Sequence, residues 1–271
     1  MKRRQSRGWT KMVPAAVIVF LLAGLGALFP VLAAADDAMD ARHLTERATQ
    51  SLENFSQAPE MDAFRSLVRD ARGVFIAPQI LKGAFFFGAS GGSGVLVARD
   101  SLSGRWLGPA FYTIGAASFG LQFGGSASEV VLLAMTDRGV NAMLESSIKL
   151  GADVAVAAGP VGMGAAASTA NLSADIISFA RAKGLFGGIS VDGAVVKTRN
   201  DLNDAYYGAV VTPVDIFRKR IAGNPHSAGL LSVVSKMAGG GGPAVRSTPK
   251  REKTPEKVEK PAEVETPAEE E

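Results

Sequence analysis

Hydrophobic residues recur at helical spacing between Asp36 and about Arg72. Pro59 interrupts the pattern, and charged residues occupy the positions between the apolar ones. This pattern predicts two amphipathic helices that meet near Ala58 and Pro59. Such helices either pack on the domain core or lie on a membrane surface, and the pattern alone leaves both arrangements open.

The pattern changes after Gly73 to short β-type runs separated by Gly, Pro, Ser and Asp. These runs cover residues 73–78, 84–87, 93–100, 104–115, 128–136, 153–159, 175–182 and 187–199. Helices are predicted from Thr136–Asp137 to Gly151, from Thr212–Pro213 to Asn224, and from Ala228 to Met237. Strands in the middle and helices at both ends predict a single α+β domain over residues 36–238, with a mostly antiparallel sheet.

The two ends of the chain differ from this central part. Residues 1–35 combine a basic start, an apolar run and Ala33–Ala35, which predicts a signal peptide cleaved after Ala35. An uncleaved membrane anchor is the alternative, and either reading predicts export to the periplasm or cell envelope. Residues 239–271 are rich in Pro, Lys and Glu and almost lack large apolar residues, so we expect a disordered tail.

The net charge of +3 does not describe the central part of the chain. Residues 36–242 contain 18 basic and 18 acidic residues, so their formal charge is zero. A nucleic-acid-binding domain needs a basic excess to displace counterions. We therefore expect no nucleic-acid partner.

The glycine-rich run from Gly88 to Gly94 does not have the pattern of a phosphate-binding loop. It lacks the G-x-G-x-x-G spacing and leads into the strand-like residues 95–97 instead of a helix. No Gly-Lys-Ser/Thr sequence follows any glycine run. These glycines are better explained by tight turns and close strand packing.

Candidate catalytic groups are scarce. The chain has no cysteine, only two histidines (His43 and His226) and no G-x-S-x-G motif. Neither histidine has a companion at metal-ligand spacing. We therefore expect neither metal nor cofactor and no enzymatic activity, although carboxylate pairs leave a lipid-acting enzyme as a third hypothesis.

Three adjacent phenylalanines, Phe85, Phe86 and Phe87, are the most unusual apolar feature. On one strand, Phe85 and Phe87 would share a face and Phe86 would take the other. Either all three are in the core, or at least one large aromatic ring meets solvent, membrane or a partner. With Lys82, and with Lys183 and Phe186 further along, they would form a basic-aromatic surface that meets phospholipid headgroups.

Ordered motifs over most of the chain resemble the SYLF domain family. They are Ala71–Gly73, Lys82–Gly83, Gly91-x-Ser93-Gly94 with Arg99, Gly104-x-Trp106 with Pro109, Gly120-x-Gln122-x-Gly124-Gly125, Gly159–Gly162, Lys183–Phe186 with Gly188, and Arg199 with Asn203 and Tyr206–Gly208. The resemblance implies a non-catalytic module that binds phospholipid, with acidic lipids and phosphoinositides favoured in eukaryotic members. It also implies a contribution from an N-terminal amphipathic helix, here within residues 36–58. Bacterial relatives are often envelope lipoproteins, but this chain lacks the cysteine that would be acylated. The actin-binding role of fungal relatives does not transfer to an exported protein.

The leading hypothesis is therefore a phospholipid-binding protein of the cell envelope, with anionic lipids as the expected partner. Its expected lipid-binding residues are Lys82, Phe85, Phe86, Phe87, Lys183, Phe186, Arg42 and Arg47. The alternative is a structural or protein-interaction module whose C-terminal tail acts as a spacer or docking segment.

Overall fold

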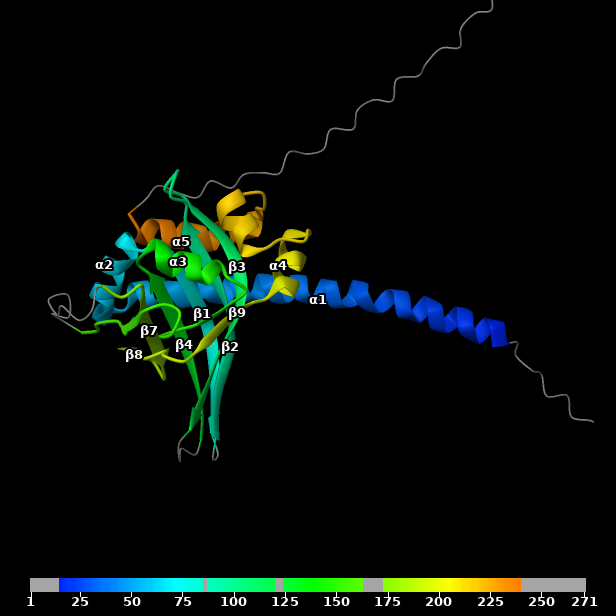
Figure 1. Cartoon of the computed structure of the whole chain (residues 1–271), viewed down its shortest axis with the longest axis horizontal. Helices are drawn as coiled ribbons and strands as arrows, with labels where there is room; N and C mark the ends of the chain where they lie inside the picture. The colour runs from blue at the N-terminus through cyan, green and yellow to red at the C-terminus, as the bar shows by residue number, and fades with distance from the viewer. Residues whose placement is uncertain (1–14, 85–86, 120–123, 163–172, 240–271) are drawn as a thin grey trace, which may run out of the picture.

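The computed structural model describes residues 15–84, 87–119, 124–162 and 173–239, with side chains described for 36–83, 89–117, 126–162 and 173–239. A curled, mostly antiparallel sheet forms the centre, and helices from both ends of the chain pack against it (Figure 1). The predicted α+β class is therefore confirmed.

The sheet contains nine strands within the described residues, in the order β5-β9-β3-β2-β1-β4-β7-β6, with β8 paired to β7. Only β6 and β7 pair in parallel among these strands. The bounds are β1 Gly73–Ala84, β2 Phe87–Arg99, β3 Trp106–Phe119, β4 Gly124–Ala134, β5 Ser147–Lys149, β6 Val156–Ala158, β7 Ile176–Ala182, β8 Leu185–Gly188 and β9 Val195–Thr198.

Four central strands extend beyond their neighbours. β9 pairs with β3 only as far as Gly115, and β7 pairs with β4 only from Ser128. Past these points the ribbon β3-β2-β1-β4 continues alone and projects from the body (Figure 1). The helices that pack on the body therefore do not cover the faces of this projecting ribbon.

The helices are α1 Ala15–Gln57, α2 Asp62–Asp70, α3 Asp137–Leu144, α4 Asn200–Tyr207 and α5 Ala228–Met237, with short helical turns η1 Pro59–Met61, η3 Asp215–Lys219 and η4 Pro225–Ser227. The break between α1 and α2 at Ala58 confirms the predicted junction. The expected cleavage point after Ala35 lies within α1. Among the described residues, no helix combines the length and hydrophobicity needed to cross a membrane.

The apolar side of α1 packs on the domain core. Leu44 is 2% exposed, and Leu52 and Phe55 are fully buried. Phe55 contacts Phe64 of α2 and Phe186 of β8, with ring centroids 5.4 and 5.0 Å apart. A helix that lies on a membrane would need this side free, so that alternative is wrong for this fold.

In the part of β1 to β4 that lies farthest from the projecting ends, both faces of the sheet are buried. Successive side chains of each strand there point alternately into two hydrophobic cores. In β2, Val95 and Val97 face α1, α2 and α5, whereas Leu96 and Ala98 face the side that carries α3 and η3. Such two-sided burial explains the nearly continuous apolar runs in the sequence.

A β-bulge in β1 exchanges the two faces of that strand. The pairing of β1 with β2 and β4 shifts between Ile76 and Leu81. Ile76 faces α1, yet Ile80 packs on the opposite side, although both positions are even. The bulge fits closely against Gly92, where a Cβ atom would lie 2.0 Å from the backbone oxygen of Gln79. The glycine interpretation, close strand packing, is confirmed at this position.

Three local predictions need correction. Helix α3 begins after the expected Thr136 cap but ends at Leu144, and Ile148 lies in β5. The helix predicted from Thr212 begins as expected, where Thr212 and Asp215 form reciprocal hydrogen bonds, but it ends at Lys219 as η3 and does not reach Asn224. Helix α4 was not predicted. The three phenylalanines do not share one strand, because β1 ends at Ala84 and β2 begins at Phe87.

Candidate functional site

An uncovered sheet surface lies beside α1, and we call it the open face. Its first row crosses β5, β9, β3 and β2 through directly paired residues. Its second row crosses the same strands and reaches β1. The first row consists of Ser147, Lys197, Thr113 and Ser93, in the order of the strands. The second row consists of Lys149, Val195, Gly115, Gly91 and Leu81. Paired residues share a face, so each row presents its side chains on one side of the sheet.

The open face begins where the helices stop covering the sheet. One step closer to the helices, Val95 and Phe111 are fully buried on this side. Thr113 and Lys197 are exposed. The change from covered to uncovered sheet therefore occurs within two residues of each strand.

Two large apolar side chains lie exposed on the second row. Leu81 is 57% exposed and Val195 is 41% exposed. Gly91 and Gly115 separate them, so no side chain rises between the two. Gly115 and Gly91 therefore form a flat stretch of backbone, which we call the floor, with the exposed apolar side chains of Val195 and Leu81 at its two ends.

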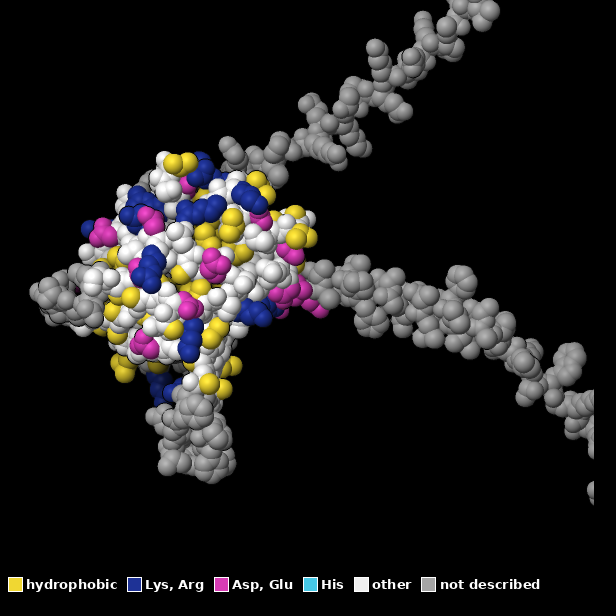
Figure 2. All heavy atoms as spheres, in the orientation of Figure 1, with side chains coloured by type: hydrophobic (Ala, Val, Ile, Leu, Met, Phe, Trp, Pro, Cys, Tyr) yellow, Lys and Arg dark blue, Asp and Glu magenta, His cyan; other side chains and the backbone are white. Residues whose placement is uncertain are grey.

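Cationic side chains flank this floor. Lys197 and Lys149 lie on β9 and the edge strand β5, next to Val195. Neither lysine forms an ion pair among the described residues. Figure 2 shows basic and hydrophobic side chains around the base of the body. An edge-strand lysine also protects an edge from aggregation, but Lys197 lies inside the sheet, where that explanation does not apply.

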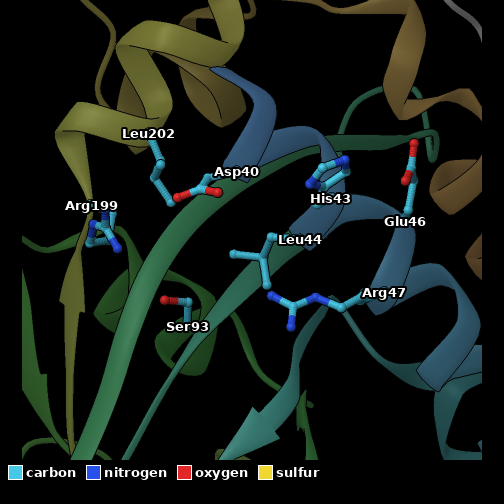
Figure 3. A pocket seen from close by; sticks show the side chains of 8 residues that line it. All are labelled: Asp40, His43, Leu44, Glu46, Arg47, Ser93, Arg199 and Leu202. Carbon is cyan, nitrogen blue, oxygen red and sulfur yellow. The ribbon is translucent and has the colours of Figure 1, made fainter. Parts of the chain in front are cut away.

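A pocket of about 500 Å³ joins the open face to α1 (Figure 3). It is lined by Asp40, His43, Leu44, Glu46, Arg47, Ser93, Arg199 and Leu202. In Figure 3 the Arg47 guanidinium extends towards Ser93, whereas His43 and Glu46 lie on the other side of the view. Arg47 has no hydrogen-bond or ion-pair partner among the described residues. Its five donors are therefore available to an anionic ligand.

Arg199 is the second arginine of the pocket, and it is already paired. Its guanidinium donates to the Asp201 carboxylate at 2.5 and 3.0 Å. Hydrogen bonding to Asp201 raises the pKa of Arg199, with further contributions from the charges of Asp37 and Asp40. The same hydrogen bonding lowers the pKa of Asp201. Arg199 also lines an adjoining hollow of about 610 Å³ with Thr113, Val195 and Lys197, so the pocket and the open face are continuous.

The structure separates the predicted lipid-binding residues. Arg47 lines the pocket. Arg42 is exposed on α1, close enough to Tyr206 that its charge opposes the rise in the Tyr206 pKa caused by burial. Lys82 lies on the opposite face of the sheet from Arg47, in a different hollow.

The remaining predicted residues fall elsewhere. Lys183 occupies the turn between β7 and β8 with a left-handed φ of 50°. Phe186 packs edge-on against Phe55, and Arg181 lies 5.8 Å above its ring. Phe85 and Phe86 lie outside the described residues, as does the side chain of Phe87. The expected single basic-aromatic surface is not formed by the described members of the set.

Sequence reasoning missed Leu81, Val195 and Lys197. Strand alternation could have placed Val195 and Lys197 on one face, opposite the buried Val196. It would have placed Leu81 incorrectly, because the bulge in β1 is not visible in the pattern. The open face combines cations with exposed apolar side chains, which suits contact with an anionic amphiphilic surface.

The two histidines have separate settings. His43 lines the pocket. His226 contacts Glu46 at 3.1 Å and Tyr206 at 3.4 Å. Within the described residues, no group of three or more His, Asp or Glu side chains could hold a metal ion.

Sequence comparison with known proteins relates this chain to one family. Residues 115–237 match the family model Ysc84, described as "Las17-binding protein actin regulator". The chain is 32% identical to Protein YSC84 of Saccharomyces cerevisiae over 177 residues, which cover 64% of the chain and 37% of that protein. It is 33% identical to the yeast LAS seventeen-binding protein 3 over 176 residues, covering 64% of the chain and 38% of the relative. With the human SH3 domain-containing YSC84-like protein 1 it shares 30% identity over 152 residues, covering 55% of the chain and 44% of the relative. The matched region therefore spans less than half the length of each of these relatives.

Proposed function

The chain contains a domain of the Ysc84, or SYLF, family, and on this basis we propose that it is a non-catalytic protein that binds anionic phospholipid membranes through the open face. One observation carries the proposal. Exposed Leu81 and Val195 lie on the same row of the sheet as Lys149, and Lys197 lies on the neighbouring row of the same face. A membrane surface offers both contacts, since anionic headgroups attract the lysines and the interface accepts the apolar side chains.

Arg47 extends the cationic side of this surface towards α1. Its guanidinium has no protein partner among the described residues and matches the geometry of a phosphate group. Ser93 beside it supplies a hydroxyl donor. A phosphate in this pocket would contact α1 and β2 together.

The magnitudes indicate how the binding energy is shared. Each basic residue near an anionic surface contributes about 1 kcal/mol and loses much of this in salt. Burying a Leu or Val side chain contributes roughly 1.5–3 kcal/mol when complete and is insensitive to salt. Because residues 36–242 carry no net charge, apolar contact must supply a large share.

The cell location remains a proposal based on residues 1–35. Their basic, apolar and small-residue segments support export, and we place the domain in the periplasm or cell envelope. In this setting the membrane that meets the open face would be an envelope membrane.

A protein partner is the second candidate function. The family description and the yeast relative's name both refer to binding of Las17. The Pro-, Lys- and Glu-rich segment of residues 239–271 would serve as the docking segment. Deletion of residues 243–271 separates the two: membrane binding by the open face survives, whereas a tail-dependent partner is lost.

The direct test is co-sedimentation of the full chain with neutral and anionic vesicles at low and moderate salt. A variant with both Lys197→Gln and Val195→Ser should bind anionic vesicles at least tenfold more weakly. Because residues 1–35 are the same in both proteins, the difference reports the open face alone. Equal binding by the two proteins would reject the proposal.

A further inference from the structure

A second hollow lies on the sheet face opposite to the open face. It lies between the strands and the segment 189–194, and its volume is about 410 Å³. Sites for small molecules commonly measure roughly 300–1,000 Å³. The hollow is therefore large enough for a ligand.

Short side chains create this space. Most of the lining residues are Ala, Gly or Ser, including Ala116, Ala180 and Ser128. In a close-packed interior, larger side chains at such positions would fill the volume. The Gly-, Ala- and Ser-rich composition of the central strands thus leaves a hollow in addition to permitting close strand contacts.

The hollow changes character along its length. One end is buried and apolar, where Ile114, Val130 and Val191 are 3%, 1% and 9% exposed. The other end is open, where Lys82 and Ser126 are exposed. A ligand that follows this gradient has an apolar body and a polar head.

The charges at the hollow indicate the sign of the head. Lys82 and Asp192 are the ionisable residues of its lining. The Asp192 carboxylate accepts a hydrogen bond from the Ser190 hydroxyl at 2.5 Å. The Lys82 ammonium has no hydrogen-bond or ion-pair partner among the described residues, and it lies at the open end with Ser126. On the segment 189–194, the Asp192 carboxylate lies beside Gly151. The charge at the open end beside Ser126 is therefore positive.

We propose that this hollow binds a single acyl chain with an anionic head, the chain in the buried end and the head beside Lys82. The ligand is a free fatty acid or one chain of a larger phospholipid, since both offer this chemistry. The site is separate from the open face and does not require that face to contact a membrane.

Chain length gives the first test. The full chain is titrated, without vesicles, with saturated fatty acids of roughly eight to sixteen carbons below their critical micelle concentrations, following displacement of a fluorescent polyene fatty acid. Affinity should rise about fourfold for each added methylene and then level off when the hollow is filled. Affinity that rises without a limit indicates nonspecific partitioning and rejects the proposal, as does absence of binding at all lengths.

Matched variants locate the binding. Ala116→Leu fills the hollow and should weaken binding at least tenfold, whereas Ala127→Leu adds the same group to the opposite sheet face and should have no effect. Ser128→Leu is a second filling variant if Ala116→Leu does not fold by circular dichroism. Equal losses in the Ala116 and Ala127 variants would reject the site.

The head is tested by Lys82→Gln. This variant should bind a fatty acid about two- to fivefold more weakly, as expected for an exposed charge pair, and the matching fatty alcohol equally well. An equal loss for acid and alcohol would reject a role for the Lys82 charge. Lysophosphatidylglycerol with the same chain separates the sources: tighter binding than the free acid identifies a phospholipid chain, and weaker binding identifies a free fatty acid. Lys197→Gln should leave all these affinities unchanged, which keeps this result independent of the open face.

Discussion

Leu81 and Lys82 are neighbours in β1, but their side chains lie on opposite faces of the sheet. Leu81 pairs with Gly91 and belongs to the open face, whereas Lys82 pairs with Ser90 and lines the open end of the hollow on the other face. The bulge between Ile76 and Leu81 decides this assignment. Without it, Leu81 and Lys82 would exchange faces, and the open face would lose an apolar end.

The cations of the open face should act additively and in a salt-dependent way. Lys197→Gln and Arg47→Gln should each weaken binding to anionic vesicles about fivefold at low salt, corresponding to about 1 kcal/mol per charge. Sedimentation at low and moderate salt measures both effects. Lys236→Gln on α5 is the control, and a loss as large in that variant would show that net charge matters and position does not.

The apolar side chains should behave differently. Leu81→Ser and Val195→Ser should each weaken binding roughly tenfold at low and at moderate salt, because burial of apolar area is not screened. Leu102→Ser is a suitable control, since Leu102 is 82% exposed but lies beyond the other end of β2. If the two serine variants bind as well as the unchanged chain, apolar contact at the open face is excluded.

Helix ends were predictable where local chemistry fixes them. Thr136 caps α3 and accepts a hydrogen bond from the Gly139 amide, and α5 has its predicted bounds at Ala228 and Met237. Helix α4 escaped prediction because Asn and Asp, which are poor helix formers, dominate its first turn. Its burial of Leu202, Asn203 and Tyr206 stabilises the helix through tertiary contacts.

The site was less predictable than the fold. The apolar pattern around Ile148 fits a helix and a strand equally, and pairing of Ile148 with Val196 selects the strand. Phe186 reads as a surface aromatic residue beside Lys183, but packing against Phe55 decides its role. Long-range pairing and a bulge place Leu81, Val195 and Lys197 together, and neither is encoded in a short stretch of sequence.

Substitution of Gly92, which packs against the bulge of β1, should destabilise the fold far more than substitution of Gly83 in the projecting ribbon. Gly92→Ala should destabilise the fold by about 1–3 kcal/mol or more, because its Cβ atom would meet the Gln79 backbone at 2.0 Å. At Gly83 no atom lies within 4 Å of an added Cβ, so Gly83→Ala should change stability by less than about 0.5 kcal/mol. Urea unfolding of both variants measures the difference. A tolerant Gly92 would contradict the described bulge packing.

Asp100 should make stability depend on pH in the acid range. Burial alone would raise its pKa, but hydrogen bonds from Ser103 and Arg220 outweigh burial and lower it. The Arg220 guanidinium lies 2.6 Å from the carboxylate. Because the folded pKa is lower than the unfolded value of about 3.9, the stabilisation is present above about pH 4 and is lost as the pH falls through the folded pKa.

Asp100→Asn should therefore lower the free energy of unfolding by about 1.5–3 kcal/mol at pH 7. The difference from the unchanged chain should shrink below pH 4. Denaturant unfolding at a series of pH values tests this. A difference that stays constant down to pH 2 would show that the charge of Asp100 is not the stabilising feature.

The most direct test of the central claim asks whether the open face itself touches the bilayer. The chain has no cysteine, so Thr113→Cys supplies a unique thiol for an environment-sensitive dye at the exposed centre of the first row. Leu102→Cys places the same dye away from that face. With anionic vesicles, the emission at position 113 should shift to the blue, and the emission at position 102 should not. Vesicle binding with no shift at position 113 would contradict the account, because another part of the chain would then make the contact.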